Sequence, residues 1–346
     1  SGEVAGGNYE GEENGTGMRM LEAVWGCCVF AAITGAGLMA AEPPHAEISN
    51  GVIQAKLYVP DAADGYYRAT RFDWSGVIAS LEYKGHEYFG QWFERYDPKL
   101  HDSIMGPVES FNTGDAGLGY KEAAAGGTFI RIGVGVVRKP SEPAYKQFNT
   151  YDIVDNGQWS THRKPNDIAF QQKLAGPAGY AYVYRKTVRM VKGKPEMVLE
   201  HTLKNTGDKP IDTSVFDHNF FMIDHLPIGP DVTITFPFEL KASGPLNGAG
   251  VLRGRQIGYT RELKKGESVH TELSGFGNSA SDYDIRIENA KAGAGVRIRG
   301  DHPLEKVVFW SIRTTACPEP YIHLHVEPGS QVTWRITYDF YEIKTR

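Results

Sequence analysis

Alternating apolar and polar residues dominate the second half of this chain, and this pattern constrains the fold more than any other feature. Residues 182–190 and 196–203 both alternate, and the segment 191–195 between them contains Gly and ends in Pro. Side chains of a β-strand point alternately to opposite faces, so a period of two predicts half-buried strands. The same pattern predicts further strands at residues 232–240, 283–288, 296–299, 307–313 and 332–343.

The spacing of these segments predicts an all-β fold. Gly, Pro, Asn and Asp separate the expected strands, which is typical of an antiparallel β-sandwich or barrel. No amphipathic helix of a dozen residues interrupts them, which argues against a parallel α/β fold. We expect one large antiparallel β-sandwich domain at 45–346. Within it we expect a hairpin at 69–83, turning at 73–76, and a loop-rich aromatic region at 90–128.

The N-terminal 40 residues have the composition of a leader. Residues 1–17 are rich in Gly, Glu and Asn and are expected to be a disordered extension. Residues 18–40 combine a short basic start, an apolar run and small residues before a polar stretch, which predicts a signal peptide and an exported protein. A retained membrane anchor is the alternative, although the apolar run is short for a span. We expect no stable membrane span after leader cleavage, which would also leave Cys317 as the one remaining cysteine.

The charge balance and the absence of familiar motifs exclude several functions. The chain has 37 basic and 42 acidic residues, a net charge of -5, so it lacks the basic surface expected of a nucleic-acid-binding protein. It contains no Gly-x-Ser-x-Gly elbow, P-loop, His-Glu-x-x-His motif or paired Cys-x-x-Cys motif. We therefore expect no cofactor.

The densest group of chemically active residues lies at 216–225. Asp217, His218 and Asn219 precede a wholly apolar stretch, which Asp224 and His225 follow. A histidine held between an acid and an amide can transfer protons near neutral pH. The alternative interpretation is a core histidine that bonds to a backbone carbonyl. We favour the functional interpretation for His218.

A second group lies at 101–111, where His101 and Asp102 stand on one side of a Gly-Pro turn and Glu109 on the other. The region around it also carries several aromatic residues, Trp92 among them. Aromatic faces and a few convergent polar groups suit a hydroxyl-rich ligand such as a sugar. A surface loop with scattered aromatic residues is the alternative, and we favour a binding site.

A third group, His323, His325 and Glu327, lies on one face of an expected strand. This arrangement suits either a metal triad or a polar strand face. We favour the polar face and predict no metal site. Nearby, Glu319 lies between Pro318 and Pro320, which would hold this carboxylate rigidly.

Some of these segments resemble a known family. Asp217-His218-Asn219-Phe220-Phe221, after the Asn-Thr-Gly of residues 205–207, is similar to the Asn-His-Ser-Tyr-Phe signature of the galactose mutarotase-like (aldose 1-epimerase) superfamily. Residues 327–330 and 334–340 resemble the Pro-Gly-Glu turn and the final Thr-x-Tyr-x-Phe strand of that family. The resemblance extends loosely from about residue 50 to the end of the chain. It implies a large β-sandwich (a supersandwich) with an open sugar-binding cleft.

The resemblance also implies a reaction, the interconversion of sugar anomers. His218 matches the position of the acid, Arg71 falls where a sugar-binding arginine is expected, and His101 loosely replaces the second histidine of the family. The catalytic Glu of the family lies shortly before the final hairpin, which we align with residues 309–315, and no carboxylate occurs there. Glu319 or Glu109 would have to be the base. The remaining expected substrate contacts are Trp92, Asp217 and Asn219.

The expected ligand is therefore a mono- or oligosaccharide. Because the base is displaced from its family position, two alternatives to an aldose 1-epimerase-like enzyme remain. One is a carbohydrate-binding protein without catalysis. The other is a relative that processes polysaccharides by lyase or hydrolase chemistry, although no pair of carboxylates has a recognisable spacing for it.

Overall fold

The computed structural model describes residues 42–112, 116–247 and 249–343. The expected N-terminal extension (1–17) and signal peptide (18–40) lie outside these residues and stay predictions. Residues 42–346 group into one compact unit. Among the described residues, no helix has the length and apolar character that a membrane span requires.

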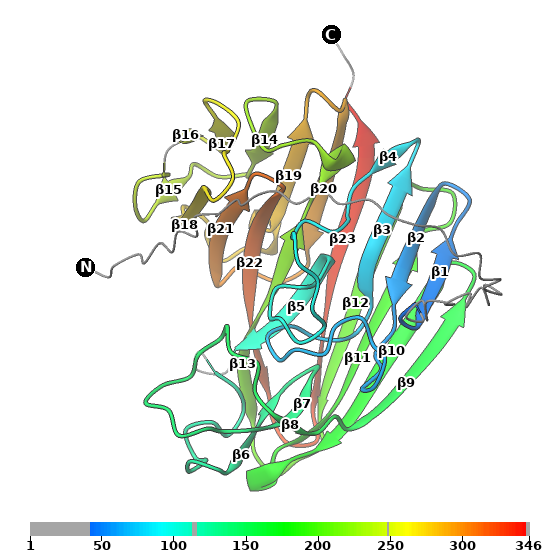
Figure 1. Ribbon diagram of the computed structural model, residues 1–346, viewed down its shortest axis with the longest axis vertical. Helices are drawn as coiled ribbons and strands as arrows, with labels where there is room; N and C mark the ends of the chain where they lie inside the picture. Colours follow the sequence, from blue (N-terminus) through cyan, green and yellow to red (C-terminus); the bar gives the residue numbers. More distant parts are fainter. Residues whose placement is uncertain (1–41, 113–115, 248, 344–346) are drawn as a thin grey trace, which may run out of the picture. The chain divides into compact units, whose positions relative to one another are not determined.

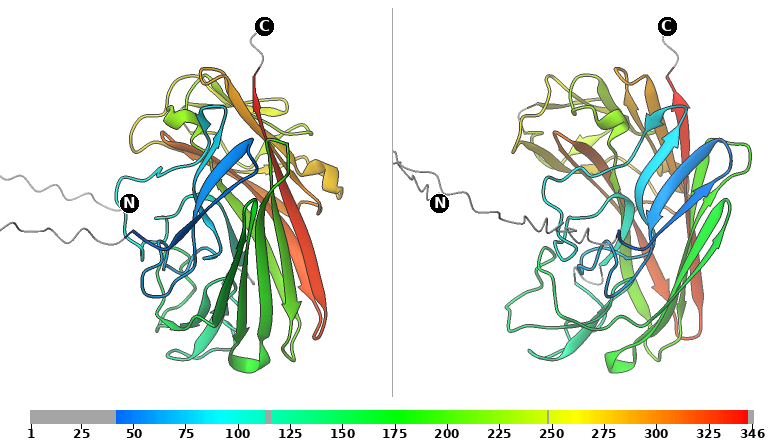
Figure 2. Two further views of the ribbon diagram at one scale, coloured as in Figure 1. Left: turned by 90° about the vertical axis from the view of Figure 1, so that its right-hand side faces the viewer. Right: turned by 45° about the vertical axis from the view of Figure 1, so that its right-hand side comes forward.

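The described strands form four antiparallel sheets (Figure 1). The smallest sheets are β6-β7-β8 and β1-β2-β3-β4, and two larger sheets face each other across the core. The ten-stranded sheet has the order β16-β17-β14-β19-β20-β23-β12-β11-β10-β9, and the six-stranded sheet has the order β15-β18-β21-β22-β13-β5. Figure 2 shows β1–β4 lying across one face of the ten-stranded sheet. The sequence-based prediction of an antiparallel β-sandwich is confirmed.

The strands of the two small sheets are β1 (His45–Ser49), β2 (Ile53–Tyr58), β3 (Val77–Tyr83), β4 (His86–Glu87), β6 (Thr128–Arg131), β7 (Gly135–Arg138) and β8 (Ile153–Asp155). The six-stranded sheet contains β5 (Gly106–Asn112), β13 (Ile211–Phe220), β15 (Lys241–Ala242), β18 (Ser268–Ser274), β21 (Lys306–Ile312) and β22 (Thr315–Val326). The ten-stranded sheet contains β9 (Gln158–Lys164), β10 (Asp167–Ala175), β11 (Ala181–Met190), β12 (Glu196–Asn205), β14 (Val232–Thr235), β16 (Gly250–Arg253), β17 (Gln256–Tyr259), β19 (Asp284–Asn289), β20 (Ala294–Gly300) and β23 (Gln331–Glu342). The described helices are 3-10 turns: η1 (Pro177–Gly179), η2 (Ile223–His225) and η3 (Ala280–Asp282).

The alternating pattern located most of the expected strands, and two predictions need correction. The strand expected at 232–240 ends at Thr235, just before Phe236-Pro237, and Pro237 has no N–H to donate to a sheet. The hairpin expected at 69–83 is wrong, because only β3 is a strand. The preceding segment is instead held by single contacts, including the hydrogen bond from Trp74 Nε1 to the carbonyl of Ala69 at 2.9 Å.

Strand β13 presents alternate side chains to the core and to the opposite face of the six-stranded sheet. It pairs with β22 on one side and with β5 on the other. Because neighbouring side chains point to opposite faces, Phe216, His218 and Phe220 lie on one face. Asp217 and Asn219 point the other way, into the interior between the two large sheets, where both reach Tyr338 of β23. This parity decides which residues of the 216–225 group can meet a ligand.

Candidate functional site

A cleft of about 500 Å³ lies on one face of the six-stranded sheet. Its volume falls in the usual range for a small-ligand site. Strands β5, β13, β18, β21 and β22 form the floor, and the loops around Arg71, Asp102 and Phe148 contribute a wall. The lining residues from the floor are Asn112, Phe216, His218, Phe220, Ser268, His270, Glu272, Lys306, Val308, Trp310, Glu319 and Tyr321.

The cleft contains a buried histidine–carboxylate pair, His218 and Glu319. The register of β13 and β22 explains it, because Phe216 pairs with Tyr321 and Phe221 bridges to Ala316, which places residue 218 opposite residue 319. His218 Nε2 lies 3.3 Å from Glu319 Oε1. Both side chains are almost fully buried, yet both line the cleft.

Burial shifts the proton affinities of this pair in opposite directions. Loss of solvent raises the pKa of Glu319 to about 7, an effect that Arg71 partly opposes. Loss of solvent also holds the pKa of His218 well below its usual value, and the positive charge of Arg71 adds to this effect. The two groups therefore hold one proton between them over a range of pH below about 7, which equips the pair for simultaneous proton donation and acceptance.

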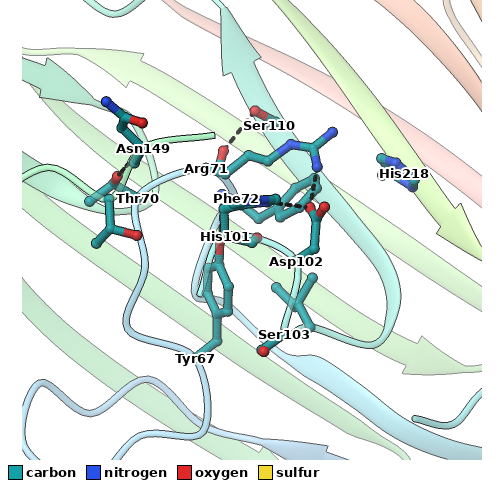
Figure 3. Close-up of polar contacts among 12 residues, drawn as sticks. Tyr67, Thr70, Arg71, Phe72, His101, Asp102, Ser103, Ser110, Asn149 and His218 are labelled. Atoms are coloured by element: carbon teal, nitrogen blue, oxygen red, sulfur yellow. Dashed lines mark hydrogen bonds and ion pairs between the residues drawn. The ribbon is translucent and has the colours of Figure 1, made fainter. Parts of the chain in front are cut away.

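Arg71 and Asp102 form the wall beside this pair. Figure 3 shows Asp102 between Arg71 and His101, with His218 beside the Arg71 guanidinium group. Asp102 Oδ1 forms an ion pair with Arg71 and lies 2.9 Å from His101 Nδ1. These two partners hold the pKa of Asp102 below its usual value despite its burial, so it is a carboxylate at neutral pH. Arg71 lines the cleft, whereas His101 lies behind Asp102 and contacts Phe148.

Hydrogen bonds to the backbone hold Arg71 in place. Its carbonyl oxygen accepts from Ser110 Oγ at 2.8 Å and from Arg131 Nη2 at 3.0 Å. Arg131 is itself buried and also donates to the carbonyl of Thr70. The guanidinium group of Arg71 lies 5.0 Å from the ring centre of Phe148, which joins the two sides of the wall by a cation–π contact.

Trp92 does not line the cleft. Its ring stacks on Phe220 with a centroid distance of 4.8 Å, and its Nε1 donates to the carbonyl of Ile104 at 2.9 Å. Trp92 is 8% exposed and packs beside the cleft, against two of its lining residues, Phe220 and Trp310. The aromatic residue that faces the cleft at this point is Trp310, which meets Trp92 edge to face at 5.5 Å.

Asp217 and Asn219 support the His218–Glu319 pair from the interior instead of lining the cleft. The hydroxyl of Tyr338 hydrogen bonds to Asp217 Oδ2 and, at 3.0 Å, to Asn219 Oδ1. Asn219 Nδ2 donates to the carbonyl of Pro318 at 3.0 Å. These bonds fix the residues on both sides of His218 and the residue before Glu319. Burial and the nearby charge of Glu109 raise the pKa of Asp217 to about 8.

Glu109 also lies in the interior, where it belongs to a buried ionic cluster. Its carboxylate oxygens lie 2.5 Å from Lys186 Nζ and 2.6 Å from His201 Nε2. All three side chains are buried. Lys186 and His201 outweigh desolvation and lower the pKa of Glu109 to about 2. The structure therefore brings Glu319, and not Glu109, to His218.

Residues 309–315, which we aligned with the catalytic Glu of the family, lie on β21, in the turn after it and at the start of β22, and the carboxylate that meets His218 lies further along β22. The last strand, β23, is preceded by β22, and β22 contains Glu319. The strand expected around His323 and His325 begins earlier, at Thr315, and Pro318 and Pro320, which have no N–H to donate to a sheet, do not interrupt it. The two prolines instead restrict the backbone on each side of Glu319.

The His323, His325 and Glu327 group is a polar strand face. Asp212 on the neighbouring strand pairs with His323 Nε2 at 2.9 Å and with His325 Nδ1 at 3.0 Å. Glu327 lies 3.1 Å from His325 Nε2. Across the part of the chain that the structure describes, no group of three or more His, Cys, Asp or Glu residues is arranged to hold a metal ion.

The cleft also contains residues that the sequence analysis did not select, namely Phe148, His270, Glu272, Lys306 and Trp310. Ser268, His270 and Glu272 alternate on β18, and Lys306, Val308 and Trp310 alternate on β21. Alternation identifies each set as one face of a strand. It does not reveal that β18 pairs with β21 and that β21 pairs with β22.

The chain has the β-sandwich fold of the galactose mutarotase-like proteins. The sequence itself matches no protein-family model and no curated protein. Solved structures do match. An aldose epimerase homologue from C. elegans is 14% identical with a TM-score of 0.53, and the match covers 87% of this chain and 99% of that one. A galactose mutarotase related enzyme from Lactobacillus acidophilus is 13% identical with a TM-score of 0.51, and the match covers 87% of this chain and 100% of that one. A galactose mutarotase-like protein from Clostridium acetobutylicum is 12% identical with a TM-score of 0.51, and the match covers 87% of this chain and 99% of that one.

Proposed function

We propose that this protein is an aldose 1-epimerase-like enzyme that interconverts the anomers of a sugar. The observation that carries the proposal is the His218–Glu319 pair, two proton-transfer groups 3.3 Å apart in a cleft beside Arg71. The neighbouring solved structures, which include aldose epimerase homologues, support a sugar as the substrate. The cleft holds both aromatic faces and hydrogen-bonding groups, as a sugar requires.

The reaction needs one group that accepts a proton and one that donates it. The base takes the proton of the C1 hydroxyl, the C1–O5 bond breaks, and its electron pair goes to O5, which takes a proton from the acid. Rotation about C1–C2 then allows O5 to attack the other face of the carbonyl. The proton transfers reverse, so the pair ends with the proton it began with. His218 and Glu319 have the required separation, because C1 hydroxyl and O5 are attached to the same carbon.

This chemistry predicts an activity that falls above neutral pH. Above about pH 7 Glu319 is ionised and His218 is neutral, so the pair has a base and no acid. Below about pH 7 Glu319 carries the proton and is the acid, and neutral His218 is the base, which reverses the roles that the family resemblance implies. The pair stays competent until His218 takes a second proton at a pH well below 6.5. We expect kcat/KM to fall about tenfold per pH unit on the alkaline side. Polarimetry between pH 5 and 9, corrected for the spontaneous reaction, measures this profile. A rate that keeps rising from pH 6 to 9 would contradict the expected protonation states.

The hydrogen bonds of Tyr338 to Asp217 and Asn219, the neighbours of His218, lead to a second prediction. Tyr338→Phe removes the hydroxyl that Asp217 and Asn219 share, and leaves buried polar groups without that partner. We expect the free energy of unfolding to fall by about 1–3 kcal/mol. We also expect kcat to fall about tenfold with KM nearly unchanged, since ångström-scale misplacement of reacting groups costs up to about 10²-fold. Urea unfolding and steady-state kinetics measure the two effects.

Tyr341→Phe is the matched control for Tyr338→Phe. Tyr341 lies on the same strand, and its hydroxyl bonds to Glu288 outside the cleft. An unchanged kcat in Tyr338→Phe, with stability lost, would limit the role of Tyr338 to folding.

The experiment that tests the proposed function is polarimetry of freshly dissolved α-glucose and α-galactose with and without the purified protein. Faster approach to the equilibrium rotation, in proportion to enzyme concentration, is the expected result. No acceleration, together with measurable sugar binding, would favour a carbohydrate-binding protein without catalysis. Shorter products from an oligosaccharide would favour hydrolase or lyase chemistry.

A further inference from the structure

The cleft floor is much wider than the catalytic pair. It crosses five neighbouring strands in the order β18, β21, β22, β13 and β5. At about 4.8 Å between neighbouring strands, five strands span about 19 Å. His270 on β18 and His218 on β13 are three strand intervals apart, which is about 14 Å. The backbone positions of these two histidines are therefore further apart than the width of one pyranose ring.

The solvent exposure of the side chains in the cleft floor increases from His218 and Glu319 towards β18. His218 and Glu319 are 3% and 6% exposed, and the Arg71–Asp102 wall stands beside them. Trp310 on β21 is half-buried, and Ser268 and His270 on β18 are exposed. The register places His270 directly opposite Trp310. The cleft is therefore closed around the pair and open over Trp310 and His270.

The open part of the floor presents groups that suit a sugar. Within the described residues, the side chains of Ser268 and His270 and the indole N–H of Trp310 make no hydrogen bond. Trp310 contacts Trp92 and His218 edge to face, which fixes its ring in the floor. An aromatic ring beside free donors and acceptors matches the apolar C–H face and the polar rim of a sugar ring.

The geometry points to an oligosaccharide as the substrate, with its reducing-end sugar over His218 and Glu319 and the next sugar over Trp310 and His270. The orientation rests on the proposed function, because anomer interconversion needs the free C1 hydroxyl at the catalytic pair. The remaining sugars then leave the closed end of the cleft along its open floor. A second sugar ring occupies the part of the cleft that a monosaccharide leaves empty.

The first part of the test compares chain lengths. The probes are glucose and galactose against maltose, cellobiose, lactose and maltotriose, each followed by polarimetry as a fresh single anomer. We expect kcat/KM for at least one oligosaccharide to exceed that of its reducing-end monosaccharide by about tenfold. The quantity to follow is the ratio of kcat/KM for the oligosaccharide to kcat/KM for its reducing-end monosaccharide. We expect this ratio to fall threefold to tenfold in His270→Ala, and separately in Ser268→Ala, which is the range for one hydrogen bond.

His162→Ala is the matched control, because His162 is an exposed histidine on β9 of the other large sheet and does not line the cleft. This variant should leave kcat/KM unchanged for both the monosaccharides and the oligosaccharides. Equal kcat/KM for monosaccharides and all the oligosaccharides would overturn the inference, as would a ratio in His270→Ala that equals the ratio in His162→Ala.

A binding measurement separates this inference from the proposed function. Calorimetric titration of the Glu319→Gln variant with the same probes needs no turnover. If the native protein accelerates no sugar, the proposed function fails. The oligosaccharide site then still stands if an oligosaccharide binds at least tenfold more tightly than its monosaccharide and His270→Ala removes most of the difference. Equal affinities, or no binding by any probe, overturn the site itself.

Discussion

Replacement of Glu319 by Gln is expected to lower kcat by about 10²- to 10⁴-fold, the usual contribution of a general acid or base. Gln has nearly the same shape as Glu and can still meet His218, but its amide cannot exchange a proton in the reaction. The loss should therefore appear in kcat, with little change in KM. Steady-state polarimetry on the sugar that the native enzyme turns over fastest measures both constants.

Two further variants make the Glu319→Gln result specific. His218→Ala should show a loss of similar size, and the double variant should lose little more, because the two groups act as one unit. Glu327→Gln is the control, since Glu327 is an exposed glutamate just after the same strand and pairs with His325 outside the cleft. Retention of more than about a tenth of native kcat in Glu319→Gln would exclude Glu319 from proton transfer.

The largest expected effect on stability comes from Lys186→Met. Lys186 and Glu109 form a fully buried ion pair, and His201 is the remaining partner of the Glu109 carboxylate. Removing Lys186 leaves the buried Glu109 carboxylate without solvent and with His201 alone beside it, and the loss of one partner of a buried pair costs about 3–5 kcal/mol. We expect the free energy of unfolding to fall by about that amount. Equilibrium urea unfolding followed by tryptophan fluorescence measures it.

A double variant shows whether the charge itself causes this loss. Glu109→Gln in the Lys186→Met background removes the stranded carboxylate, and we expect it to recover most of the lost stability. Lys192→Met, in the exposed turn between β11 and β12, is the matched control and should change stability by less than about 0.5 kcal/mol. A loss below 1 kcal/mol in Lys186→Met would show that the cluster contributes little.

The residues near His218 show how much of the site the sequence could reveal. The alternation in β13 already contained the information that Asp217 and Asn219 face away from His218, because they are its direct neighbours in a strand. We had nevertheless grouped them with His218 as substrate contacts. Glu109 gave no comparable signal, since its partner Lys186 lies 77 residues away in the other large sheet.

The sequence by itself determined that the chain is an antiparallel β-sandwich, since alternation and turn residues are local properties of each segment. It also selected His218 as a candidate site residue, and the structure places this residue in a cleft. The tertiary structure decided which carboxylate meets that histidine and which polar residues lie in the core. Asn219 and Pro318 are in contact and yet 99 residues apart, because strands β13 and β22 are neighbours in the sheet. Strand order and register arise from packing of the whole domain, and local periodicity contains neither.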